Sequence, residues 1–434
     1  MNEKVRQQHL LHLGKAEKIF KALRGLLVGQ ESALSRIVLA SLSARPLTVS
    51  PDNGAEEILE ARNVNACAPV LLMGNPGKGK TYLASIMALA ISGDFERIQC
   101  TPDLQPTDIT GTSVIQGENI NFYPGPLLRA NILLADELSR MPPKTQAALL
   151  APTSEDAVWV SAPSSGGRKE TKKMKISLKS PHFFIGSQNP RTEEGTYPIV
   201  GAALDRFAMI LRFRPLTISE LMSLQRKNEM MLKPQRPDRI SLTDFQEMRK
   251  FIFEEMKVPI ETECLIATLV QLLNPAMSGL EHDESFRALY EQIWEQQFDI
   301  QADSLPPRLV LVKPQTVSGS HLYRLHDFIA AISEERPTLF LRYLGKALAF
   351  TKTDRHGGAR EAVWPSDIYK IYPDVMRNRI RPTHIMESLG FEWLAEAILD
   401  LVLQIVKTSD GFHSELPTMA ERMALRMKRD GRQE

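Results

Sequence analysis

The strongest constraint on this chain is a stretch with the spacing of a phosphate-binding loop, Gly74-Asn75-Pro76-Gly77-Lys78-Gly79-Lys80-Thr81. An apolar run over 68–73 precedes it and a helical pattern over 81–90 follows it, so it stands between a predicted buried strand and a predicted helix. Glycines let the backbone turn tightly and aim its N–H groups at phosphate oxygens. A Gly- and Lys-rich stretch can also form an ordinary turn, but this context favours a nucleotide-binding loop.

The loop also predicts roles for its side chains. Lys80 is expected to reach the β- and γ-phosphates of ATP, and the Thr81 hydroxyl is expected to bind Mg²⁺, an ion that prefers oxygen ligands and bridges to the nucleotide. The residues expected to bind the nucleotide are Gly74, Asn75, Pro76, Gly77, Lys78, Gly79, Lys80, Thr81 and Tyr82.

A second signal is a pair of adjacent carboxylates at the end of an apolar strand pattern over 131–137. This position places Asp136 and Glu137 at the carboxyl edge of a sheet, where open α/β folds bind their ligands. Asp136 is expected to bind Mg²⁺, and Glu137 to orient and polarise an attacking water. Acidic residues also favour helix N-termini, but the phosphate loop earlier in the chain favours the catalytic interpretation.

Further strand patterns over 95–100, 183–187 and 208–213 alternate with helical ones, which predicts a parallel sheet. The strand over 183–187 brings Asn189 to the same edge, where its amide can donate to and accept from a lytic water or the γ-phosphate. On its own, Asn189 could equally be a turn residue before Pro190.

Composition excludes several classes of protein. The chain of 434 residues is 43% hydrophobic and 24% charged with a net charge of +1, so it has no overall bias toward nucleic acid. Its three cysteines lack metal-ligand spacing and favour a reducing compartment, and no apolar stretch is long enough to span a bilayer. We therefore expect a cytoplasmic protein without a membrane partner.

The change to a helical pattern after about residue 215, with breaks at prolines, predicts three domains. Residues 1–215 form the nucleotide-binding core with a helical lead-in, and 216–380 form a smaller all-α domain with an irregular insertion at about 279–325. Residues 381–434 form a C-terminal helical extension.

A predicted hairpin with arms over 157–160 and 175–178 has a basic tip near 168–175. The tip could contact phosphates or be a solvated loop, and no aromatic residue is interleaved with its cations for base stacking.

Taken together, these residues resemble the MoxR family of AAA+ ATPases. The resemblance covers about 15–215 and resumes near 336–380. Its motifs are the phosphate loop, Leu133-Leu134-Ala135-Asp136-Glu137-Leu138-Ser139-Arg140, Pro142-Pro143-Lys144-Thr145-Gln146, Ser187-Gln188-Asn189-Pro190, Leu204-Asp205-Arg206-Phe207 and Trp364-Pro365-Ser366-Asp367.

The resemblance implies a ring-forming ATPase, in which an AAA+ P-loop core with a three-layer parallel sheet precedes a smaller all-α lid. Lys80 and Thr81 would be the Walker A residues, Asp136 and Glu137 the Walker B residues, and Asn189 sensor 1. Arg206 would be the arginine finger, and Arg336 sensor 2, although Glu334 and Glu335 replace the family's usual small residue and proline before it.

Other implications concern partners. The family suggests a homo-oligomer, expected to be a hexameric ring, that uses ATP and Mg²⁺ to remodel or activate protein clients with a von Willebrand factor A-domain protein. The family's insertion into helix 2 would fall at 111–126, either facing a ring pore or forming a surface loop. The alternative class is a DNA-dependent, helicase-like AAA+ motor that uses the basic hairpin.

Overall fold

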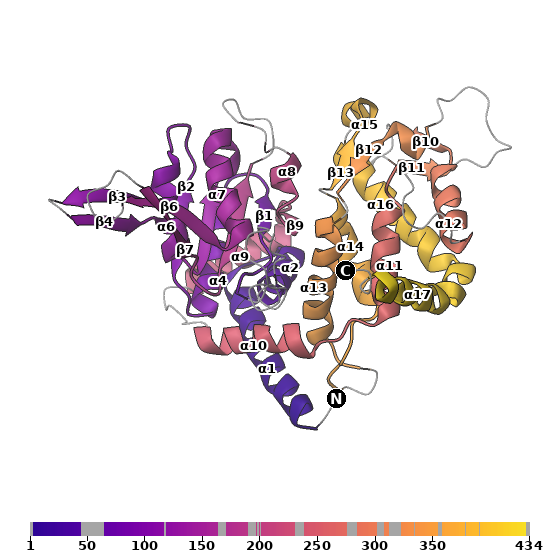
Figure 1. Ribbon diagram of the computed structural model, residues 1–434, viewed down its shortest axis with the longest axis horizontal. Coiled ribbons are helices and arrows are strands. Elements are labelled where there is room, and N and C mark those ends of the chain that lie inside the picture. Colours follow the sequence, from indigo (N-terminus) through magenta and orange to yellow (C-terminus); the bar gives the residue numbers. More distant parts are fainter. Residues whose placement is uncertain are drawn as a thin grey trace. The chain divides into compact units, whose positions relative to one another are not determined.

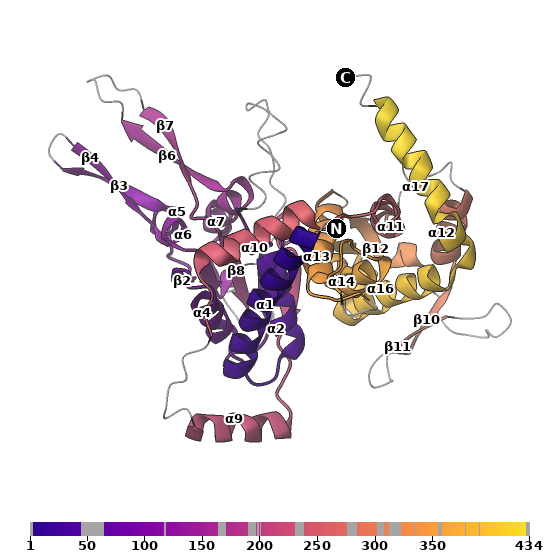
Figure 2. The same cartoon turned by 90° about the horizontal axis from the view of Figure 1, so that it is seen from below.

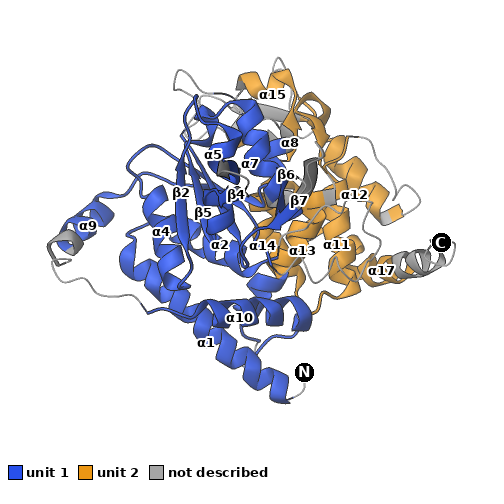
Figure 3. Cartoon of the chain, turned by 60° about the vertical axis from the view of Figure 1, so that its left-hand side comes forward, with its two compact units in different colours: residues 1–256, 346–361 blue, residues 257–345, 362–434 orange. Residues whose placement is uncertain are grey.

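The fold is described from a computed structural model. Its description covers all residues except 1–2, 45–64, 117–118, 164–170, 190–196, 198, 200, 231–237, 276–283, 302–307, 312–322, 334, 355–357, 378, 390 and 431–434. These residues form two compact units, one of 1–256 with 346–361 and one of 257–345 with 362–434 (Figure 3).

A parallel five-stranded sheet organises the first unit (Figure 1). Its strand order is β2-β5-β8-β1-β9, and every neighbouring pair is parallel. The strands are β1 (Val70–Met73), β2 (Phe95–Gln99), β5 (Ile132–Asp136), β8 (Phe183–Gln188) and β9 (Met209–Arg212). The register pairs Gln99 with Asp136 and Met73 with Gln188, so the carboxyl ends of four strands meet at one edge.

Helices cover both faces of this sheet. Leu133 and Phe184 face a buried cluster with side chains of α5 (Pro106–Thr110), α6 (Pro126–Arg129) and α7 (Pro143–Glu155). Alternate strand positions point to opposite faces, and Leu134 on the other face is equally buried. The remaining helices of the first unit are α1 (Glu3–Leu26), α2 (Glu31–Leu42), α4 (Lys80–Ala90), α8 (Gly201–Leu204), α9 (Ile218–Met230) and α10 (Leu242–Glu255), with the 3₁₀ turn η1 (Leu138–Arg140).

Two antiparallel hairpins project from the first unit (Figure 2). The hairpin of β3 (Gly111–Gln116) and β4 (Asn119–Pro124) lies within the predicted insertion at 111–126. The hairpin of β6 (Ala157–Pro163) and β7 (Thr171–Ser177) matches the predicted arms, and its register pairs Trp159 with Lys175.

The second unit is mainly helical. Its helices are α11 (Ile260–Gln271), α12 (Glu284–Trp294), α14 (Pro365–Met376), α15 (His384–Leu389), α16 (Phe391–Thr408), α17 (Asp410–Asp430) and the first part of α13 (Glu335–Phe350), with the 3₁₀ turn η2 (Leu325–Asp327). Two short antiparallel pairs accompany them: β10 (Phe298–Gln301) with β11 (Arg308–Leu311), and β12 (Ile329–Ile332) with β13 (Ile380–Pro382).

The predicted fold class is confirmed, since a parallel sheet between helices precedes a helical C-terminal region. Two details differ from the sequence predictions. Helices α9 and α10 group with the sheet rather than with the region 216–380, and the described part of 279–325 contains α12 and β10–β11. Helix α12 forms because Phe286, Leu289 and Ile293 recur at helical spacing and are buried. The functional domain boundaries at 215 and 380 stay predictions.

None of the helices within the described ranges is both long and apolar enough to cross a membrane.

Candidate nucleotide site

The predicted phosphate loop connects β1 to α4, as its sequence context requires. Gly77 and Gly79 adopt positive φ angles of 74° and 87°, which glycine tolerates without steric cost. A Cβ atom on Gly74 would come within 2.8 Å of the Phe213 side chain, so this position also favours glycine. No acidic residue occupies the first turn of α4, which leaves its positive dipole end available to an anion.

Within the loop, exposure varies with position. Asn75, Pro76 and Gly77 are exposed, Lys78 is half-buried, and Tyr82 on the first turn of α4 is 43% exposed. The structure therefore presents the crest of the loop and the Tyr82 ring to solvent, where a nucleotide could contact them.

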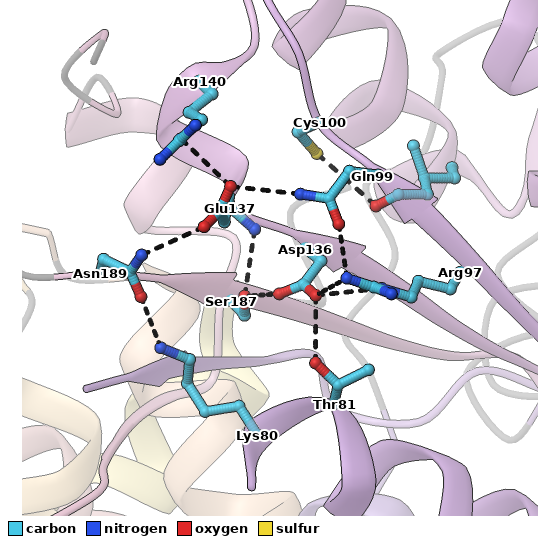
Figure 4. A network of polar contacts seen from close by, with 11 residues as sticks. Lys80, Thr81, Arg97, Gln99, Cys100, Asp136, Glu137, Arg140, Ser187 and Asn189 are labelled. Atoms are coloured by element: carbon cyan, nitrogen blue, oxygen red, sulfur yellow. Dashed lines mark hydrogen bonds and ion pairs between the residues drawn. The ribbon is translucent and has the colours of Figure 1, made fainter. Parts of the chain in front are cut away.

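Lys80 lies buried beneath this crest. Its ammonium donates to the carbonyl oxygen of Gly74 and to Oδ1 of Asn189, the latter at 2.7 Å. Lysine carries three donors and no acceptor, so these contacts hold the cation at the base of the loop. The predicted sensor residue, Asn189, thus contacts the predicted Walker A lysine directly (Figure 4).

Asp136 ends β5 among four donors from three other residues. Its Oδ2 accepts from the Thr81 hydroxyl at 3.0 Å and from Arg97 Nε and Nη2 at 3.0 and 2.7 Å, and its Oδ1 accepts from the Ser187 hydroxyl. Burial alone would raise the pKa of this carboxyl, but the hydrogen bonds from Ser187, Thr81 and Arg97 together lower it. Asp136 is therefore an anion at neutral pH.

Glu137 leaves the strand in the left-handed region, with φ of 58°. Its Oε2 accepts from Arg140 at 3.1 Å and from Gln99 at 3.2 Å, and its Oε1 accepts from Asn189 at 3.2 Å. Its backbone N–H donates to Ser187 Oγ at 3.1 Å. A non-glycine residue at positive φ persists only where its surroundings hold it, and these contacts direct one oxygen of the carboxylate toward Asn189 (Figure 4).

The two carboxylates also affect a neighbouring thiol. Burial, followed by the charges of Asp136 and Glu137, raises the pKa of the Cys100 thiol to about 12. Cys100 is thus a neutral, buried side chain that takes no part in the chemistry of the site.

The donor set fits Mg²⁺. Thr81 and Asp136 offer a hydroxyl and a carboxylate oxygen at 3.0 Å from each other. Within the described ranges no group of three or more His, Cys, Asp or Glu residues could hold a metal. Mg²⁺ suits this arrangement because it typically uses one or two protein ligands and completes its shell with waters and phosphate oxygens.

The two predicted arginines come from other elements than the residues of this network. Arg206 is half-buried in the turn between α8 and β9, just before β9 begins at Met209. Because β9 is parallel to β1, Arg206 lies near the amino end of the strands, whereas the phosphate loop follows their carboxyl ends. Arg336 begins α13 in the second unit, and its role as sensor 2 stays a prediction.

Sequence reasoning missed four members of the network: Arg97, Gln99, Arg140 and Ser187. Arg97 and Gln99 are two residues apart on β2 and therefore share a face. Their alternation places both side chains on one face of β2, but what they contact there depends on the register of β2 against β5.

Comparisons with known proteins find similar sequences and a similar structure. The sequence profile of the "ATPase family associated with various cellular activities (AAA)" matches residues 69–209. The chain is 28% identical to Chaperone MoxR1 of Mycobacterium tuberculosis, over 81% of this chain and 78% of that protein, and 24% identical to Protein MoxR of Methylorubrum extorquens, over 78% and 85%. It is also 40% identical to the uncharacterized protein YeaC of Bacillus subtilis, over 39% of this chain and 51% of YeaC.

Among solved structures, a Cytophaga hutchinsonii protein described as an ATPase superposes with a TM-score of 0.66 at 23% identity, covering 93% of this chain and 98% of that one. This similarity shows a shared fold. The parallel sheet, the glycine-rich loop after β1 and the adjacent carboxylates that begin at the last residue of β5 agree with the AAA+ ATPase family, whose profile matches here. With its relatives, the chain belongs to the MoxR family of AAA+ ATPases.

Proposed function

We propose that this protein binds ATP with Mg²⁺, hydrolyses it between the subunits of a ring, and uses the energy to remodel or activate protein clients as a chaperone. The observation that supports this most directly is the network joining Lys80, Asn189 and Glu137 at one sheet edge. It connects a phosphate-binding cation, a sensor amide and a carboxylate suited to activate water.

Each of these residues has a distinct task in the proposed reaction. Lys80 binds the phosphates, and Glu137 accepts a hydrogen bond from the attacking water and orients it. Asn189 contacts both Lys80 and Glu137, so in the proposed reaction it couples the presence of the γ-phosphate to the position of Glu137. Mg²⁺ held by Thr81 and Asp136 would neutralise charge on the phosphates.

The position of Arg206 supports a site shared between subunits. Four residues of β9 at about 3.3 Å each separate its amino end from the edge that bears the loop. An arginine near the far edge is poorly placed to complete the site of its own chain, so we propose that it acts on the nucleotide of a neighbouring subunit. A closed ring, proposed to be hexameric, provides such a neighbour for every site.

The family suggests the kind of partner. One relative is named as a chaperone, and MoxR-like ATPases act with von Willebrand factor A-domain proteins. We propose that such a protein, encoded as a separate chain, links this ATPase to its client, and co-purification tests the link.

A specific observation favours the DNA motor as a second candidate. The basic tip at 168–170 and the side chains of Lys172 and Lys173 lie outside the described residues. The strand register, however, places the aromatic residue Trp159 opposite the basic residue Lys175. Trp159 is 54% exposed, and Lys175 Nζ lies 5.6 Å from the centroid of its ring. Such a pair could stack on an unpaired base.

The two functions are separated by stimulation of the ATPase. A DNA motor should turn over faster with single-stranded DNA, and Trp159→Ala should remove that increase together with salt-sensitive binding. A chaperone should respond to its protein partner and be indifferent to DNA and to the Trp159 change.

Specific ATPase activity measured against protein concentration tests the proposed function itself. Turnover per chain should rise as rings assemble and then reach a plateau, and Lys80→Ala should abolish both nucleotide binding and turnover. Failure of the wild-type protein to bind ATP would contradict the proposal.

A further inference from the structure

We propose that Arg97 is a positioning residue that sets the Mg²⁺ requirement of the nucleotide site, because it competes with the metal ion for one oxygen of Asp136. The inference rests on the proposed function, since it concerns the metal that accompanies the nucleotide.

The competition follows from how the Asp136 carboxylate distributes its partners. Oδ1 accepts from Ser187, whereas Oδ2 accepts from Thr81 and, with two nitrogens, from Arg97 (Figure 4). Oδ2 is the oxygen that lies beside the Thr81 hydroxyl, so it is the oxygen of Asp136 that would be offered to a metal held by both residues.

Thr81 and Arg97 differ in how they respond to a metal. The Thr81 hydroxyl can donate its hydrogen bond to Asp136 while its lone pairs face a cation. The guanidinium of Arg97 has no acceptor, and its positive charge repels a cation. Binding of Mg²⁺ at Oδ2 therefore leaves the bond from Thr81 intact but requires Arg97 to withdraw.

The structure also offers Arg97 a second acceptor. Its Nη2 donates to Oε1 of Gln99 at 2.5 Å, and Gln99 in turn donates to Oε2 of Glu137 at 3.2 Å. Arg97 can thus leave Asp136 without losing every partner. Its withdrawal would also disturb Gln99 and so transmit metal binding to the carboxylate proposed to activate water.

The size of the effect is limited by solvent. The Arg97 side chain is 47% exposed, whereas that of Asp136 is 9% exposed. Charge-assisted hydrogen bonds are strong when buried but weak when a partner is in water. We therefore expect removal of Arg97 to change the metal dependence about three- to tenfold.

The experiment measures the affinity of wild-type and variant proteins for a fluorescent ADP analogue, once with excess EDTA and once with saturating Mg²⁺. The ratio of the two dissociation constants gives the gain in affinity due to Mg²⁺. The variants are Arg97→Gln, Arg97→Lys and Arg129→Gln. Arg129 is a matched control because its side chain is 51% exposed and it pairs with Glu96, which lies on β2 beside Arg97.

The proposal predicts that the gain from Mg²⁺ rises about three- to tenfold in Arg97→Gln and stays at the wild-type value in Arg129→Gln. Arg97→Lys, with a compact charge and no planar fork, should lie between Arg97→Gln and wild type. The increase in unfolding temperature caused by Mg²⁺ alone should follow the same order.

Two results would overturn the proposal: an unchanged or smaller gain in Arg97→Gln, or the same change in Arg129→Gln, which would point to a general charge effect. If Arg97→Gln did not fold, an unchanged gain in a folded Arg97→Lys protein would overturn it equally. Absence of ADP binding by the wild-type protein in both buffers would instead contradict the proposed function.

Discussion

Three side-chain donors contact the Glu137 carboxylate. A catalytic carboxylate must be held in position and must carry a charge, and these two requirements can be tested separately. Arg140 and Gln99 hold Oε2, while Oε1 faces Asn189. An amide in the same place keeps the shape of the side chain and removes its charge and basicity, while one acceptor oxygen becomes a donor nitrogen.

Glu137→Gln is expected to bind ATP with near wild-type affinity and to hydrolyse it about 10²- to 10⁴-fold more slowly. Nucleotide retention and phosphate release in single-turnover experiments measure the two effects separately. Glu155→Gln, at an exposed position on α7, is the control and should behave as wild type. Undiminished turnover in Glu137→Gln would remove the general-base role.

At the residue scale, the sequence predicted the positions of the functional groups that lie in the glycine-rich loop and at strand ends. Lys80, Asp136 and Asn189 were expected at one edge, and the structure brings them together there. Arg97 was not expected, because its contact depends on how β2 is registered against β5. The register of a strand depends on the whole sheet and cannot be predicted from a local motif.

At the scale of elements, the loop between β1 and α4 depends on backbone conformations that only glycine adopts without strain. Gly79 has a φ of 87° and is the N-cap of α4, so it fixes the direction in which Lys80 and Thr81 leave the loop. The loop geometry is therefore sensitive to a single added methyl group.

Gly79→Ala should destabilise the protein by about 1–2 kcal/mol, the usual cost of a left-handed alanine, and weaken ATP binding as the loop relaxes. Urea denaturation and nucleotide titration measure these effects. The control is Gly14→Ala in α1, where an added Cβ meets no atom within 4 Å. That change should leave ATP binding intact and stabilise the helix by about 0.5–1 kcal/mol.

Helix α1 provides a second test through its buried imidazoles. His9 Nε2 donates to the Phe350 carbonyl at 3.0 Å and its ring stacks on that of Phe350. Burial lowers the pKa of His9, and burial followed by the charge of Lys15 lowers that of His12. Both imidazoles are therefore neutral in the folded protein near pH 7.

A lowered folded-state pKa means that the unfolded chain binds the proton more readily. The free energy of unfolding should thus be at its full value above about pH 6.5 and fall as the pH decreases through the lowered folded-state values. Urea denaturation between pH 5 and 7 measures this. A His9→Gln, His12→Gln double variant should show a flatter dependence over that range, and an unchanged slope would exclude the two histidines as its source.

The strands of the sheet were predicted more closely than the grouping of the helices that follow it. The strands of the sheet follow from short buried runs, and the structure places them within a residue or two of the predicted positions. In the described part of 279–325, the apolar spacing of α12 favours a helix although prolines follow it in the sequence. The grouping of α10 with the sheet depends on tertiary contacts such as Arg249 to the carbonyl oxygens of Ser43 and Ala66, which no local pattern reveals.

At the scale of the whole molecule, the central claim is that each active site combines residues of two chains. One chain supplies Lys80, Asp136 and Glu137, and its neighbour supplies Arg206. An arginine contributed in trans typically raises turnover about 10³- to 10⁵-fold. Arg206→Ala alone and Glu137→Gln alone should therefore both be nearly inactive while still assembling.

Mixing these two inactive variants is the most direct test of that claim. In randomly mixed rings, about a quarter of the interfaces join an intact Glu137 to an intact Arg206, so the ATPase activity of an equal mixture should recover to about a quarter of the wild-type value per chain. Assembly of the mixed rings is checked by light scattering. Rings that assemble but remain inactive, or an Arg206→Ala protein with normal turnover on its own, would contradict the shared active site.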